Sequence, residues 1–200
     1  MNEIKEKISI FAENGSGWAL EKKLHLDINI NKYNPLYASS YIPLPKQIAK
    51  KHAVINIKNN DNYCFAWSII SALFPSQKNV NRTTSYPNFF NILNFKEIEF
   101  PVKLKDIKKF ENLNKISVNV YGLESIYVDN ILKYEVVGPY YFTEKKLPLH
   151  VNLLLINQGN KNHYFWIKDK SNLESSQINN MCNKKYFCDG CLIYFYSKEK

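Results

Sequence analysis

Residues 59–75 read NNDNYCFAWSIISALFP, a polar run followed by an apolar segment that ends at a proline. From residue 64 to residue 74 the apolar side chains recur at helical spacing on a broad face, which predicts a buried helix. Asp61 or Asn62 can cap its first turn by accepting hydrogen bonds from free backbone N–H groups. The sequence therefore places Cys64 at the start of a buried helix.

Strand patterns dominate the rest of the chain. Residues 151–156 and 163–167 give the strongest pair, and the six residues between them, which include Gly159, suit a hairpin loop. A central helix followed by an antiparallel sheet predicts an α+β fold. Weaker patterns predict strands over residues 24–30, 53–57 and 117–121, one or two short helices within 76–100, a helix over 104–112, and an aromatic tail over 186–196.

Composition limits the class of protein. The 200 residues are 45% hydrophobic and carry a net charge of +9, which fits one globular domain and excludes a disordered tail. No segment approaches the ~20 consecutive apolar residues of a membrane span, and the charged N-terminus leads into no apolar signal core. We therefore expect an intracellular protein, cytoplasmic or nuclear, that does not insert into a membrane.

The basic excess alone does not predict a nucleic-acid-binding protein. Its lysines are scattered, and Arg82 is the single arginine. Proteins that recognise nucleic acids favour arginine, because its planar guanidinium makes bidentate contacts with bases and phosphates. Nucleic acid is a possible partner but is not the favoured one. The sequence leaves the oligomeric state open.

Cys64 is the first candidate for chemistry. A thiol at a helix N-terminus lies near unpaired N–H groups and the positive end of the helix dipole, which stabilise the nucleophilic thiolate. The loop from Asn59 to Asn62 and the Cys64 backbone N–H could supply the donors of an oxyanion hole. The alternative is a structural cysteine, since free cysteines are among the most buried residues.

His163 is the best candidate for a base, because it opens a strand about a hundred residues after the cysteine. Neutral imidazole can take the thiol proton and later protonate the leaving amine. Asp169, six residues on, or Asn172 could orient the imidazole if the chain turns back after the strand. Each of these residues could equally serve an ordinary hairpin or turn.

The motif Asp61-Asn62-Tyr63-Cys64-Phe65 resembles the D-x-x-C-[LF] signature of ovarian-tumour-type deubiquitinases, and His163-Tyr164 is similar to their His followed by an aromatic residue. Asn59 and Asn62 also resemble the asparagines that precede the nucleophile of ubiquitin-specific proteases. The chain departs from the ovarian-tumour pattern at Phe165, where those enzymes usually carry Asn or Asp. A third catalytic residue must then come from elsewhere in the chain.

This resemblance implies a papain-like cysteine protease that cleaves after the terminal glycine of ubiquitin or a ubiquitin-like protein, without a cofactor. It implies Cys64 as nucleophile, His163 as base, and Asp61 with Asn62 in the oxyanion loop. Tyr164 would shape the channel for the two terminal glycines. Tyr63 and Asn59 would also contact the substrate.

A second resemblance covers most of residues 13–195 and implies no activity by itself. The chain looks like a domain encoded in Maverick/Polinton-type transposons and related insect viral sequences, which often continue into a zinc-finger-like segment and a DNA polymerase. The stretches that carry this resemblance are 15–18, 33–45, 55–67, 100–102, 119–122 and the Cys188/Cys191 pair.

The two resemblances together predict a catalytic domain over residues 1–180 and a partial Cys-x-x-Cys knuckle over residues 181–200, the start of a truncated zinc-finger-like segment. Cys182 could add a third thiolate, but structural zinc needs four ligands, so no complete metal site is expected. Two alternatives to a deubiquitinase stay open. One is a protease of a viral polyprotein, and the other is a non-catalytic module that binds nucleic acid or a polymerase.

Overall fold

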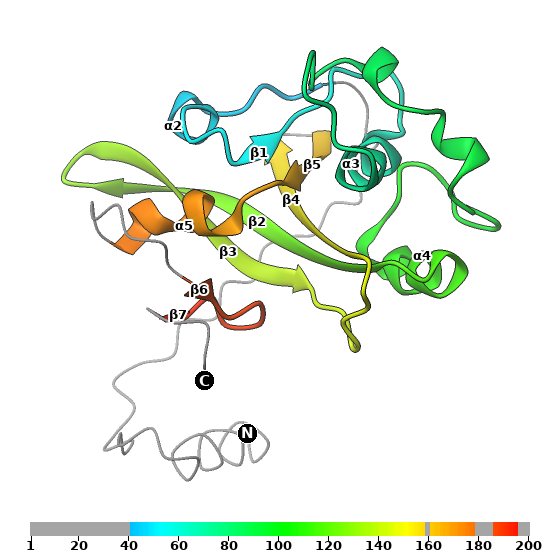
Figure 1. The fold of residues 1–200 in the computed structure, drawn as a ribbon. Helices are drawn as coiled ribbons and strands as arrows, with labels where there is room; N and C mark the ends of the chain where they lie inside the picture. Colours follow the sequence, from blue (N-terminus) through cyan, green and yellow to red (C-terminus); the bar gives the residue numbers. More distant parts are fainter. Residues whose placement is uncertain (1–40, 159–160, 179–185, 196–200) are drawn as a thin grey trace, which may run out of the picture. The chain divides into compact units, whose positions relative to one another are not determined.

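The computed structural model describes residues 41–158, 161–178 and 186–195, which lie within one compact unit (Figure 1). The predicted strand over 24–30 and Cys182 lie outside these residues. Among the residues described, no helix is both long and apolar enough to cross a membrane. The helices are α2 (Lys46–Ala49), α3 (Cys64–Leu73), α4 (Ile107–Asn114) and α5 (Lys170–Ile178), with short 3-10 turns at Thr83–Ser85, Phe89–Asn91 and Leu104–Asp106.

The predicted α+β class is confirmed, but the sheet is mixed rather than antiparallel. Its five strands lie in the order β1-β5-β4-β2-β3, and β2 pairs with β4 in parallel. The reason is β3, which the sequence patterns did not reveal. It returns antiparallel along β2, so the chain emerges beside the start of β2 and β4 must run in the same direction. The bounds are β1 Val54–Ile55, β2 Ser117–Val128, β3 Ile131–Tyr141, β4 His150–Gln158 and β5 Lys161–Ile167.

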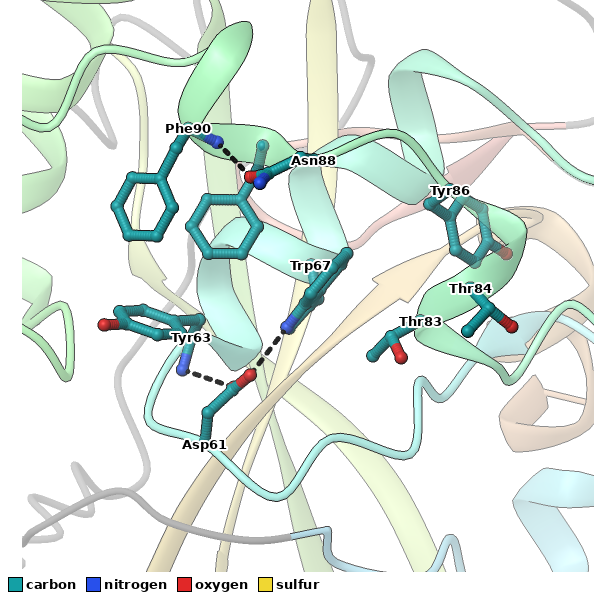
Figure 2. Close-up of a pocket in the computed structure, with 9 residues that line it drawn as sticks. Asp61, Tyr63, Trp67, Thr83, Thr84, Tyr86, Asn88 and Phe90 are labelled. Carbon is teal, nitrogen blue, oxygen red and sulfur yellow. Dashed lines mark hydrogen bonds between the residues drawn. The ribbon is translucent and has the colours of Figure 1, made fainter.

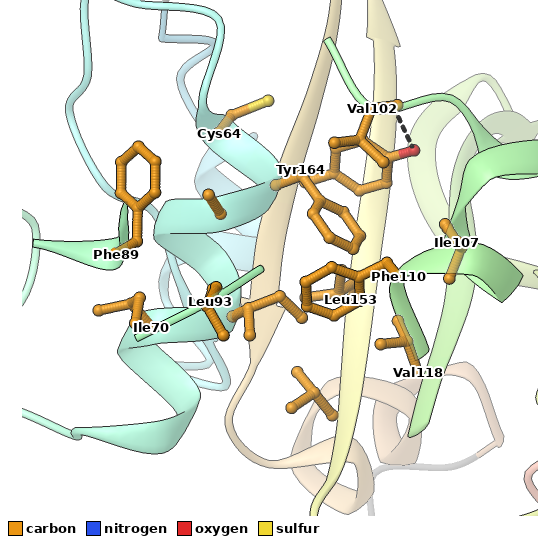
Figure 3. Packing of buried hydrophobic residues seen from close by; sticks show 14 of the residues in the cluster. Cys64, Ile70, Phe89, Leu93, Val102, Ile107, Phe110, Val118, Leu153 and Tyr164 are labelled. Carbon is orange, nitrogen blue, oxygen red and sulfur yellow. Dashed lines mark hydrogen bonds between the residues drawn. The ribbon is translucent and has the colours of Figure 1, made fainter. Parts of the chain in front are cut away.

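Side chains alternate between the two faces of this sheet, as the two-residue period of a strand requires. Leu153 and Tyr164 join one buried cluster, which also contains residues of α3 and α4 (Figure 3). Leu154 and Phe165 join a second cluster, with Ile48 of α2 and Leu173 of α5. Because both faces are covered, β4 reads as a nearly continuous apolar run rather than as a polar–apolar alternation.

The central helix forms where the sequence predicts it. α3 starts at Cys64 and ends at Leu73, one residue before the expected end. Phe65 and Ile69 are fully buried on its inner side, and Phe65 meets Phe110 of α4 edge to face at 5.0 Å between ring centroids. α3 packs mainly on β5, so the helix start that carries Cys64 is held against the strand that carries His163.

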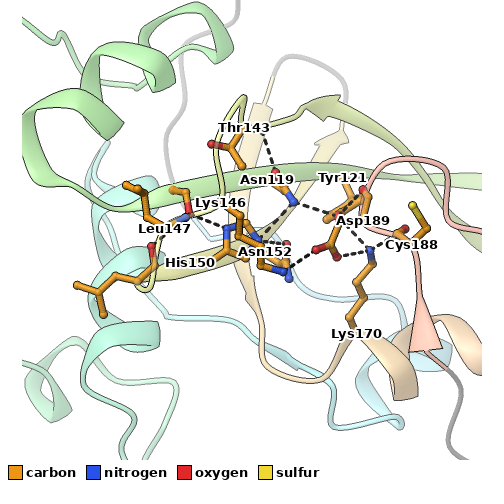
Figure 4. Close-up of polar contacts among 12 residues, drawn as sticks. Asn119, Tyr121, Thr143, Lys146, Leu147, His150, Asn152, Lys170, Cys188 and Asp189 are labelled. Carbon is orange, nitrogen blue, oxygen red and sulfur yellow. Dashed lines mark hydrogen bonds and ion pairs between the residues drawn. The ribbon is translucent and has the colours of Figure 1, made fainter. Parts of the chain in front are cut away.

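The Cys188/Cys191 pair lies in a tight turn between the short strands β6 (Tyr186–Phe187) and β7 (Tyr194–Phe195). This turn is anchored to the sheet by Asp189. Its carboxylate pairs with Lys170 at 2.9 Å, and its carbonyl accepts a hydrogen bond from the Tyr121 hydroxyl at 2.9 Å (Figure 4). Within the described residues, no cluster of three His, Cys, Asp or Glu side chains that could hold a metal ion forms here or elsewhere.

Burial makes Leu153 a test of the core. Leu153→Ala should lower the free energy of unfolding by about 2–5 kcal/mol, because it removes buried methyl groups and leaves a cavity. Leu149→Ala, at a side chain that is 54% exposed, should cost far less. Urea denaturation of the two variants measures the difference. Equal losses would contradict this description of the core.

Candidate active site

Cys64 occupies the first position of α3, with Tyr63 before it as the N-cap residue. The first backbone hydrogen bond of the helix runs from the Trp67 N–H to the Tyr63 carbonyl at 2.9 Å. The N–H groups before Trp67 therefore have no acceptor within the helix itself. The Cys64 side chain is buried, at 4% exposed. The geometry at the helix start matches the prediction, but the solvent access that an active nucleophile needs is small.

The backbone of Tyr164 on β5 holds this helix start. Its carbonyl accepts a hydrogen bond from Ser68 Oγ at 2.9 Å, and its N–H points at the sulfur of Cys64. These groups are available because β1 pairs with β5 only at Trp166 and Ile167. The sulfur therefore lies at the peptide group that joins His163 to Tyr164.

Burial dominates the acidity of the thiol, contrary to the expectation of a stabilised thiolate. Loss of solvent raises the pKa of Cys64 to about 11, and the N–H groups of Tyr164 and Phe65 offset only part of this effect. The nearby Asp61 carboxylate raises the pKa further. At neutral pH the resting side chain is therefore a thiol.

His163 is 1% exposed and makes a hydrogen bond through Nε2 with Asn56 Oδ1 at 3.2 Å. The amide of Asn56 is fixed in turn, because its Nδ2 donates to the Ile42 carbonyl at 2.9 Å. Its oxygen must then accept, so Nε2 carries the proton and Nδ1 is left as the basic nitrogen. Asn56 thus selects the imidazole tautomer.

Sequence reasoning missed Asn56. It stands just after β1, in the stretch Val54-Ile55-Asn56-Ile57, where a polar residue interrupts an otherwise apolar segment. That interruption was the available signal. It was obscured because asparagine is abundant throughout the chain.

Asp169, the expected orienting residue, does not reach His163. β5 continues in extended form from His163 to Ile167, and these four steps carry the chain roughly 13 Å away before the bend at Lys168. Asp169 instead accepts a hydrogen bond from the Asn172 N–H at 3.0 Å, at the start of α5. The Asn172 side chain donates to the Lys51 carbonyl at 2.6 Å. The chain does not turn back toward the imidazole. Asn56, rather than Asp169 or Asn172, is the hydrogen-bond partner of the His163 ring.

Asp61 organises the loop before Cys64. Its Oδ1 accepts from Asn59 Nδ2 at 2.7 Å and from the Tyr63 N–H at 2.9 Å, and its Oδ2 accepts from Trp67 Nε1 at 3.2 Å. The Asn59 side-chain donor is therefore used within the loop, whereas the Asn62 side chain is exposed. The Asp61 carboxylate can only accept hydrogen bonds, so it cannot stabilise an oxyanion. Backbone N–H groups are therefore the better donors at this loop.

The two tyrosines expected to contact substrate lie in different environments. The Tyr164 ring is buried against Phe65 at 5.2 Å between centroids, with its hydroxyl donating to the Val102 carbonyl. This ring is part of the core. The Tyr63 ring is partly accessible and packs edge to face on Phe100 at 4.6 Å. Of the two, Tyr63 has the side chain that a substrate can touch.

Within the described residues, no hydrogen bond joins the Cys64 and His163 side chains, and the sulfur contacts the backbone of β5 rather than the imidazole. The imidazole packs on Phe165, 4.7 Å away between ring centroids, whereas the sulfur approaches the strand at the Tyr164 N–H. Comparison of the chain with protein-family models, curated proteins and solved structures gives no match.

Burial gives His163 a measurable pH signature. Loss of solvent lowers the pKa of its imidazole to about 4, against a partial opposing effect of Asp61. The unfolded chain binds the proton near pH 6.5, so this residue contributes stability above that pH and the contribution is lost as the pH falls toward 4.

We therefore expect the difference in free energy of unfolding between the wild type and His163→Gln to change with pH. As the pH falls from 6.5 to 4, the wild type should lose a few kcal/mol more than the variant. Urea denaturation across this range measures the difference. The comparison with the variant removes the contributions of other titrating groups. A difference that does not change with pH would contradict a buried, neutral imidazole.

Proposed function

We propose that the chain is a thiol-dependent hydrolase of papain-like architecture, with Cys64 as nucleophile, His163 as general base and Asn56 as the residue that orients the base. The observation that carries this proposal is the hydrogen bond between His163 Nε2 and Asn56 Oδ1 at 3.2 Å. It leaves Nδ1 unprotonated, which is the state that a base needs before it accepts a proton.

The position of Cys64 supports the same reaction. Its sulfur lies beside the His163–Tyr164 peptide group, and the Asp61 carboxylate acts on the pKa values of both residues. Asp61 favours a protonated imidazole and disfavours a thiolate. When the proton moves from sulfur to imidazole, Asp61 therefore stabilises the imidazolium that forms but not the thiolate.

The proposed reaction begins when His163 Nδ1 takes the thiol proton and Cys64 Sγ attacks the substrate carbonyl carbon. The N–H groups at the start of α3 stabilise the negative oxygen that forms. The imidazolium then protonates the leaving amine, the C–N bond breaks and a thioester remains. Water, deprotonated by the neutral imidazole, attacks the thioester and releases the acid and the thiol.

For the substrate we propose the (iso)peptide bond after the terminal glycine of ubiquitin or a ubiquitin-like protein. Support comes from the motif around Cys64 and the His163-Tyr164 pair. The neutral resting state of the buried thiol further implies that substrate binding precedes proton transfer, because the ion pair is costly to form in a dry site.

The first test is the reaction of the full chain with ubiquitin that carries a C-terminal thiol-reactive warhead, followed by intact mass measurement. We expect one adduct on the wild type and none on Cys64→Ala. Cys191→Ala, which removes an exposed thiol, should keep the adduct. An adduct that survives in Cys64→Ala would remove this cysteine as nucleophile. A Cys64 that is inert to ubiquitin, ubiquitin-like and peptide warheads alike would overturn the hydrolase.

A second test addresses Asn56. Asn56→Ala should lower kcat on ubiquitin with a fluorogenic C-terminal amide by about 10- to 100-fold, because the imidazole loses its fixed tautomer. The KM should change little, since Asn56 positions the base and does not bind substrate. Asn157→Ala, at an exposed asparagine of β4, serves as the control. A loss confined to KM, or equal in both variants, would contradict a positioning role.

A further inference from the structure

A surface pocket of about 410 Å³ lies on the outer side of the α3 start (Figure 2). Its walls come from the loop before α3, from α3 itself and from the irregular segment that follows. Nine residues line it, and Asp61 is the one among them that carries a charge.

Aromatic rings form one side of this pocket. Phe89 packs against both Tyr63 and Trp67, with centroid distances of 5.2 Å and 4.8 Å. Phe90 packs on Tyr63 at 5.4 Å and is 56% exposed at the rim. Aromatic faces carry negative electrostatic potential and attract a cation placed over them.

The Asp61 carboxylate lies between Tyr63 and Trp67 in Figure 2, and its oxygens accept three hydrogen bonds from the loop and the helix. A carboxylate offers about four acceptor positions, so one remains at Oδ2, which among the described residues accepts from the Trp67 indole alone. Asp61 is itself partly accessible to solvent. A negative group with spare acceptor capacity thus faces a pocket lined with aromatic rings.

We propose that this pocket binds a basic side chain, lysine or arginine, of a polypeptide partner. The aliphatic stem packs on the accessible rings of Tyr63 and Phe90, and the cationic end contacts the Asp61 carboxylate and the aromatic faces. The net charge of +9 repels a basic ligand from the protein as a whole, so the local negative charge of Asp61 is required. The proposal does not depend on Cys64 being a nucleophile.

Calorimetric titration of the full chain with short capped peptides tests the ligand class. The peptides carry one central lysine, arginine, citrulline or norleucine in an otherwise identical neutral sequence. We expect the lysine and arginine peptides to bind at least about ten-fold more tightly than the two neutral ones, because only they make a charge-assisted contact. Equal affinities, or no binding of the basic peptides at millimolar concentration, would overturn the proposal.

Variants of the pocket test its location. Asp61→Asn should weaken binding of the basic peptides by about ten-fold. Asp129→Asn, at an exposed turn residue, changes the net charge equally and should leave the affinity unchanged. Phe90→Ala, at the exposed rim, should weaken binding several-fold and removes no loop hydrogen bond. Equal effects of the two Asp→Asn variants, or no effect of Phe90→Ala, would place the binding elsewhere. Cys64→Ala should bind like the wild type, so this outcome is independent of the hydrolase test.

Discussion

The arrangement of the candidate site depends on how short β1 is. This strand pairs with β5 at two positions only, Val54↔Ile167 and Ile55↔Trp166. Beyond that point, the outer edge of β5 offers the backbone groups of Tyr164 to another partner, and buried backbone groups must be satisfied. Helix α3 meets this requirement with Ser68 Oγ and the sulfur of Cys64. The edge of the sheet thus fixes where the helix begins.

The chain leaves β1 at the same place and brings Asn56 to His163. One interruption in strand pairing therefore determines the position of the thiol, the imidazole and the amide that selects its tautomer. Both reactive groups are buried and neutral at rest. Asp61 has opposite effects on them, since its negative charge favours an imidazolium and disfavours a thiolate. In the proposed reaction, the charge separation arises with substrate bound, when a reacting carbonyl and the helix N–H groups can stabilise it.

The sequence was informative where a single element carries its own pattern. Helix α3, the β4–β5 pair and the turn at Cys188 follow from local spacing and from residues that end or permit turns. β3 escaped because polar and apolar residues do not alternate in its sequence, ILKYEVVGPYY, and because Gly138-Pro139 interrupts any strand pattern there. The parallel pairing of β2 with β4 depended on β3 and was missed with it. The papain-like architecture and the role of Asp61 or Asn62 in an oxyanion loop are still predictions.

Asn56 illustrates why a site is harder to predict than a helix. Its partner His163 lies 107 residues further along the chain, whereas β4 and β5 are joined by a short connection. Closing a longer loop costs more chain entropy, so local hairpins form more easily than the pairing of β1 with β5. β1 holds its place with two residues, and such an edge is among the first elements of a native fold to open. When it opens, His163 loses the group that fixes its tautomer while the rest of the sheet stays paired. The tautomer of the imidazole is therefore tied to local fluctuations at the end of the sheet rather than to global unfolding.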